Sequence, residues 1–134
     1  MFYLIEKNSM DTEYFLIEKY KDVVCLPHVH YHAELFFVLD GNVQMNLETK
    51  VYHLKKGDMA VVMPYEIHDY QSVEQSDILV VEFPLKYIAE YKTVLEGKSF
   101  QTPVIQVTQP LQSLLTELVE NETPHIFCTK ALIY

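Results

Sequence analysis

The feature that most constrains the fold is a run of seven residues, His-Val-His-Tyr-His-Ala-Glu, at positions 28–34. It leads directly into an apolar segment, residues 35–39, which ends at an Asp-Gly turn closed by Gly41. Alternate side chains of an extended strand share one face, so the even-numbered polar residues would point the same way: His28, His30, His32 and Glu34. Phe36 continues that face and the odd-numbered residues fill the other. The pattern predicts a strand buried on both sides, with a polar cluster facing the interior.

The spacing sets a condition on which of these residues can meet. Alternate residues of a strand lie about 7 Å apart, so the side chains of His28 and His30 can reach one ion. Residues 30 and 34 of a straight strand would lie about 13 Å apart. Glu34 therefore joins the two histidines only if the chain bends or bulges between residues 31 and 33. Without a bend, His32 is the third member.

A second stretch, residues 57–68, has a similar layout. A Gly-Asp turn leads into the apolar run 59–63, and Pro64 then precedes a single histidine, His68. Aromatic residues surround both stretches, which is typical either of core packing or of a small pocket with aromatic walls and a few polar groups. These residues are Tyr31, Phe36, Phe37, Tyr52, Tyr65 and Tyr70.

Together the two stretches resemble the two motifs of the cupin family, whose fold is a double-stranded β-helix, also called a jelly-roll barrel. The first motif has the family's spacing throughout, at His28, His30, Glu34 and Gly41. The second motif matches at Gly57, Pro64 and His68. Glu66 stands where the family usually has glycine, and Ser72 stands where it often has asparagine.

The Pro-x-Glu-x-His form of the second motif is most similar to the cupin domain of AraC-type bacterial transcription regulators. This resemblance implies a domain that binds a small-molecule effector and forms a homodimer. It also implies that DNA is bound only through a C-terminal helix-turn-helix domain that this sequence does not contain. The predicted ligand-binding residues are His28, His30, His32, Glu34, Phe36, His68 and Tyr70.

In metal cupins, the positions that match His28, His30, Glu34 and His68 hold a divalent ion. Histidine with one carboxylate suits Zn, Ni, Fe or Mn, and the sequence does not choose among them. The alternative is an inherited pattern in which these side chains hydrogen-bond one another or a ligand. A metal-dependent cupin enzyme, either a dioxygenase or an isomerase, is accordingly the second functional hypothesis beside the effector-sensing domain, which would not be an enzyme.

The net charge and the absence of arginine limit the kinds of molecule that this chain is expected to bind. The net charge is -9, and all ten basic residues are lysines. Nucleic-acid binding depends on positive charge and base reading uses arginine, so the present sequence predicts no DNA binding of its own. Without a guanidinium, strongly anionic ligands are disfavoured, and a small polar metabolite or a sugar is the expected effector. The sequence shows neither a membrane-spanning run nor a signal peptide, which predicts a cytoplasmic location without a membrane partner.

Short strands separated by turns predict an all-β sandwich or barrel over residues 1–84. Within it, residues 43–47 are expected to pair back on residues 34–39 through the Gly41 turn. Apolar residues then recur at helical spacing at 85–95 and 111–119, and a further helix is expected from residue 124. This predicts two to three helices within a helical extension at residues 85–134, with residues 100–107 as a linker or edge strand. These helices resemble the start of a dimerisation region, and the uncapped apolar end predicts that the sequence stops before a further domain.

Overall fold

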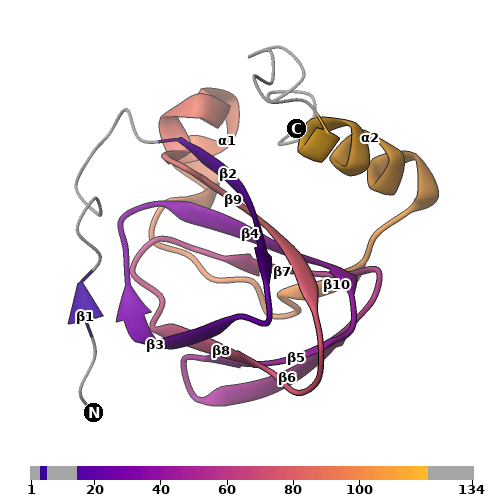
Figure 1. The fold of residues 1–134 in the computed structure, drawn as a ribbon. Helices are drawn as coiled ribbons and strands as arrows, with labels where there is room; N and C mark the ends of the chain where they lie inside the picture. Colours follow the sequence, from indigo (N-terminus) through magenta and orange to yellow (C-terminus); the bar gives the residue numbers. More distant parts are fainter. Residues whose placement is uncertain (1–3, 6–14, 121–134) are drawn as a thin grey trace.

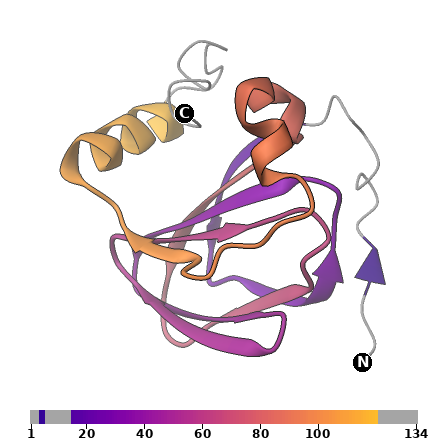
Figure 2. The same ribbon diagram turned by 180° about the vertical axis from the view of Figure 1, so that it is seen from behind.

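Two five-stranded sheets face each other across a buried interior, and the helices cover the outer face of the second sheet (Figures 1 and 2). The structure is a computed structural model, which describes residues 4–5 and 15–120. The first sheet has the order β1 (Leu4–Ile5), β3 (Val24–Val29), β8 (His68–Ser72), β5 (Asn42–Leu47), β6 (Lys50–Lys55). The second has the order β10 (Val104–Gln106), β7 (Asp58–Val62), β4 (Ala33–Asp40), β9 (Asp77–Phe83), β2 (Leu16–Lys21). This is the jelly-roll barrel that the sequence predicts.

Strands β4 and β9 are buried on both faces, as the continuous apolar pattern predicts. Their even-numbered residues, including Phe36 and Val80, point into the barrel and pack against Met45 and Leu54 of the first sheet. Their odd-numbered residues form a second core on the outer face of the sheet. That outer core contains Phe37, Leu79, Val81, Leu85, Ile88 and Leu115. One sheet therefore separates the barrel interior from a helix-covered core.

The helical segment begins with a short 3-10 helix, η1 (Leu85–Ile88), which continues into α1 (Ala89–Leu95). The chain then returns to the second sheet, where β10 pairs with β7 as an edge strand. Helix α2 (Gln109–Glu120) follows, and its Leu115 is buried in the outer core with Leu111 and Leu114 packed beside it. The helical periodicities at 85–95 and 111–119 are thus confirmed, whereas the helix expected from residue 124 lies outside the described residues.

The hairpin expected at Gly41 is wrong. Strand β5 pairs with β6 and β8 in the first sheet, while β4 pairs with β7 and β9 in the second. Gly41 has a φ of +85°, and it carries the chain from one sheet to the other. An Asp-Gly pair is compatible with both kinds of turn, because it supplies only the left-handed conformation.

The division at residue 84 stays a prediction, although β10 shows that the chain beyond it contributes to the barrel sheet. Within the described residues, no helix combines the length and the apolar character needed to cross a bilayer.

Candidate functional site: a buried histidine and glutamate cluster

The chain bends between β3 and β4, and this bend assembles the polar cluster. Strand β3 ends at Val29 in the first sheet, and β4 begins at Ala33 in the second. Residues 31 and 32 form the bend between them. The condition under which Glu34 reaches His30 is therefore met.

Three histidines and a carboxylate converge inside the barrel. The Nε2 atom of His30 lies 3.5 Å from Oε1 of Glu34, and Nε2 of His68 lies 3.7 Å from Oε2 of the same carboxylate. The rings of His28 and His68 have centroids 4.1 Å apart. All four residues are buried, with Glu34 at 0% exposure. The structure thus brings together the four residues that match the metal-binding positions of cupins.

Backbone carbonyls fix the orientation of each imidazole. The Nδ1 atoms of His28, His30 and His68 each lie 2.9 Å from a carbonyl oxygen, of Leu26, His32 and Glu66 respectively. An Nδ1–H that donates to a carbonyl leaves Nε2 of a neutral ring with its lone pair available, which is the usual arrangement of a metal-binding histidine. The Nε2 atom of His30 and both oxygens of Glu34 are buried without a hydrogen bond.

The electrostatic environment favours charge on His30 and Glu34. Burial alone would lower the pKa of His30, but Glu34 and then Glu82 outweigh it and raise that pKa. Burial would raise the pKa of Glu34, but His30 and His68 hold it well below its ordinary value. Burial and the neighbouring His68 lower the pKa of His28. The cluster therefore contains a carboxylate that keeps its negative charge inside an apolar barrel.

Sequence reasoning missed a second buried carboxylate, Glu82. Its Oε1 lies 3.9 Å from Nε2 of His30, and the residue is 4% exposed. A signal was present in the sequence, because Glu82 is the one charged residue in the apolar run 78–83. Its face could be assigned only once the pairing of β4 with β9 was known.

Two groups of side chains could hold a metal ion among the described residues. One is His28, His30 and His68, and the other is His30, Glu34 and Glu82; within each group the donor atoms lie within 4.8 Å of one another. Two donors at about 2.1 Å from one ion lie at most about 4.2 Å apart, a limit that the His30–Glu34, His68–Glu34 and His30–Glu82 distances all respect. This donor set, which includes carboxylate oxygens of Glu34 that accept no hydrogen bond, fits a divalent transition metal.

The other predicted ligand-binding residues line the same interior, but they do not belong to either group. His32 is fully buried, and its carbonyl oxygen orients His30. Phe36 and Tyr70 pack against each other with ring centroids 4.5 Å apart. Burial, followed by the charge of Glu34, raises the pKa of Tyr70 well above its ordinary value.

Glu66 supports the loop that carries His68. Its Oε1 accepts a hydrogen bond from the backbone N–H of Met63 at 2.8 Å, and its own carbonyl orients His68. The glutamate at the family's glycine position thus has a structural role that the sequence did not reveal. In the same loop, Tyr65 has a φ of +69°, and its N–H donates to the carbonyl of His30 at 2.9 Å. The loop is tied directly to the cluster.

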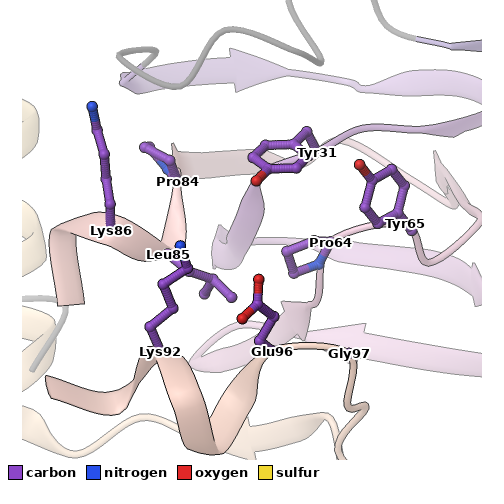
Figure 3. Close-up of a pocket in the computed structure, with 9 residues that line it drawn as sticks. All are labelled: Tyr31, Pro64, Tyr65, Pro84, Leu85, Lys86, Lys92, Glu96 and Gly97. Atoms are coloured by element: carbon purple, nitrogen blue, oxygen red, sulfur yellow. The ribbon is translucent and has the colours of Figure 1, made fainter. Parts of the chain in front are cut away.

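A cavity of about 250 Å³ lies between this loop and the helical segment (Figure 3). The barrel contributes Tyr31, Pro64 and Tyr65. The rings of the two tyrosines meet edge to face, with their centroids 5.6 Å apart. The helical side contributes Pro84, Leu85, Lys86, Lys92, Glu96 and Gly97. In Figure 3 the side chains of Lys92, on α1, and Glu96, just after α1, point toward the other lining residues, whereas Lys86 extends away from them. None of the seven predicted ligand-binding residues lines this cavity.

Comparison with known sequences gives one family. The model of the AraC-like ligand-binding domain matches residues 12–134 of the chain. No curated protein sequence matches it.

Comparison with solved structures gives the same architecture. An apo variant of ToxT from Vibrio cholerae has a TM-score of 0.64 at 13% identity, over 89% of this chain and 52% of ToxT. ToxT with a bound unsaturated fatty acid has a TM-score of 0.63 at 12% identity, and the match covers 89% of this chain and 51% of ToxT. A Streptococcus pyogenes protein of unknown function, SPY1581, has a TM-score of 0.52 at 15% identity, and the match covers 61% of this chain and 80% of SPY1581. These likenesses show a shared fold, and the present chain spans about half the length of ToxT.

Proposed function

Because the chain belongs to the AraC-like ligand-binding domain family, we propose that it is the small-molecule sensing domain of an AraC-type transcription regulator. In this proposal the regulator is a cytoplasmic homodimer, and DNA is bound by a helix-turn-helix domain outside the present sequence. The family match favours this regulatory role over the metal-dependent enzyme that the sequence also suggested.

The observation that carries the proposal is the position of the cavity. Its walls come partly from the barrel loop at Pro64 and Tyr65 and partly from η1 and α1. A ligand in this cavity contacts both parts at once. A ligand can shift an equilibrium between two arrangements of the helices only if it binds one arrangement better than the other. Because this cavity lies between two parts of the chain, its shape, and therefore its affinity for a ligand, depends on how the two parts are arranged.

The lining residues favour a ligand with a compact apolar body and a carboxylate end. Two prolines, two tyrosines and Leu85 provide apolar surface, and the charged lining residues, Lys86, Lys92 and Glu96, together leave one positive charge. ToxT has been solved with an unsaturated fatty acid and with (E)-4-(8-methylnaphthalen-1-yl)but-3-enoic acid, both of this chemical class. In this cavity such a ligand fits better than the sugar or small polar metabolite that the sequence favoured.

The test is calorimetric titration of the chain with the naphthyl-butenoic acid and, in parallel, with the corresponding primary alcohol. Lys92→Gln should weaken binding of the acid about 10- to 100-fold, because a charge-assisted hydrogen bond contributes about 1.5–3 kcal/mol. It should leave binding of the alcohol unchanged. Lys98→Gln is the matched control, because Lys98 is exposed and does not line the cavity. Equal losses in the two lysine variants, or no binding of either compound, would contradict the assignment of the cavity.

The buried cluster has a separate role in this proposal, as a binding site for a divalent transition metal held by His28, His30, Glu34 and His68. The ion would supply positive charge where Glu34 is fully buried, and it would connect β3, β4 and β8, which belong to different sheets. Because Tyr65 is hydrogen-bonded to the carbonyl of His30, a braced cluster also fixes one wall of the effector cavity.

A further inference from the structure

Glu34 and Glu82 lie directly opposite each other on neighbouring strands. They are register partners in the antiparallel pairing of β4 with β9, and both point into the barrel with the even-numbered core residues. Neither strand is at a sheet edge. Their exposures are 0% and 4%, so water does not screen one carboxyl group from the other.

Such a pair is costly without a compensating charge. Like charges directly opposite on a sheet are destabilising even at a surface, and two carboxylates that share a buried site cannot both ionise readily. His30 approaches both carboxylates, at 3.5 Å from Glu34 and 3.9 Å from Glu82, and His68 lies 3.7 Å from Glu34. A divalent ion bound beside His30 would bring enough positive charge to balance both carboxylates.

Glu82 shares a group of potential metal ligands with His30 and Glu34, two of the four family positions. His30 is common to both groups of potential ligands, and Glu34 contacts His68 of the first group at 3.7 Å. A site that combines both groups has three imidazoles and two carboxylates. Zinc sites are almost always satisfied with four donors, whereas carboxylate donors suit manganese and harder ions.

We infer that Glu82 is a fifth metal-binding residue. It converts a site of three histidines and one carboxylate into a site with two carboxylates. The second carboxylate raises the affinity for Mn²⁺ more than the affinity for Zn²⁺. The inference depends on the metal site proposed above, and it is independent of the effector cavity.

The test starts from the chain stripped of metal with a chelator and titrated calorimetrically with MnCl₂ and, separately, with ZnCl₂. Glu82→Gln keeps the size of the side chain and removes its charge. We expect it to weaken Mn²⁺ binding at least tenfold and Zn²⁺ binding by a smaller factor, while Glu34→Gln weakens both strongly. Glu18→Gln is the control, since it makes the same charge change at an exposed position on β2, the strand beside β9.

X-ray absorption at the manganese edge then separates direct binding from a charge effect. Direct binding predicts different metal–ligand distances in Glu82→Gln than in the parent chain, because a water or the neutral amide oxygen takes the place of the carboxylate oxygen. Unchanged distances, or unchanged Mn²⁺ affinity in Glu82→Gln alongside a loss in Glu34→Gln, would overturn the role of Glu82 and leave the four-residue site standing. Failure of the parent chain to bind either ion would overturn both. Thermal melting in chelator checks that each variant folds, and Glu82→Met replaces Glu82→Gln if that variant does not.

Discussion

Replacing Gly41 with alanine should destabilise the domain far more than the same change at Gly57, although the two glycines have nearly the same backbone conformation. Their φ angles are +85° and +91°. An alanine in the left-handed region costs about 1–2 kcal/mol, and this cost applies at both positions. At Gly57 an added Cβ would meet nothing closer than Nε2 of Gln112, at 3.8 Å. Gly57→Ala should therefore cost only that conformational term.

At Gly41 the added Cβ would lie 2.0 Å from the carbonyl oxygen of Gln75 and 2.8 Å from Cα of Ser76. Relief to an ordinary contact of about 3.4 Å requires the backbone at 75–76 to move by more than 1 Å. That backbone is held to Asp22 by two hydrogen bonds of 3.0 Å, each worth about 1 kcal/mol. Forced repacking adds about 1–3 kcal/mol. Together with the conformational cost and the two hydrogen bonds, the total for Gly41→Ala is about 4–7 kcal/mol.

Urea denaturation of the two variants, followed by circular dichroism, measures this difference directly from the free energies of unfolding. A difference of about 3–5 kcal/mol between the two variants is a large part of the roughly 5–15 kcal/mol that stabilises a typical domain, so Gly41→Ala should also be poorly folded at 37 °C. Equal destabilisation of the two variants would refute the steric argument and with it the close approach of the sheet-crossing turn to residues 75–76.

Three further predictions concern the site and its supports. Glu66→Ala removes the acceptor of the buried Met63 N–H and should cost about 1–3 kcal/mol in unfolding free energy, with weaker ligand binding in calorimetry; unchanged ligand affinity would show that the loop does not depend on this bond. Leu115→Ala, at a side chain 1% exposed, should cost about 2–5 kcal/mol, measured by thermal denaturation, and a cost below 1 kcal/mol would mean that α2 does not pack on the sheet in solution. Adding a chelator to metal-loaded protein should lower the unfolding free energy by about 2.7 kcal/mol when the free metal had been at 100 times its dissociation constant, and an unchanged melting temperature would speak against a metal in the cluster.

The sequence predicted the cluster because its information is local. Alternation assigned His28, His30, His32, Glu34 and Phe36 to one face, and all five are buried in the structure. The required bend was stated as a condition and is found at residues 31–32. Local spacing could also identify helices at 85–95 and 111–119, since a helix is defined by neighbours in the chain.

What the sequence could not supply depends on contacts between distant segments. Glu82 becomes the partner of Glu34 only through the register of β4 against β9, which no local pattern specifies. The cavity requires the helical segment to dock beside Tyr31 and Tyr65, and the periodicity of a helix does not say where it will dock. The same limit explains the wrong hairpin at Gly41, since turn chemistry constrains the backbone but not the sheet that the next strand joins.

The placement of β10 has a mechanical consequence for signalling. In the second sheet β9 and β10 are separated by β4 and β7, so the segment containing α1 starts and ends on strands about 14 Å apart. A segment fixed at both ends can rotate or tilt about its supports, but it cannot swing free. In the proposed function, a movement of α1 on ligand binding can pass along the chain to α2 only through β10, which the sheet holds in place. Coupling between the cavity and α2 would then pass through the outer core, where Leu111 and Leu115 of α2 pack with residues of the second sheet.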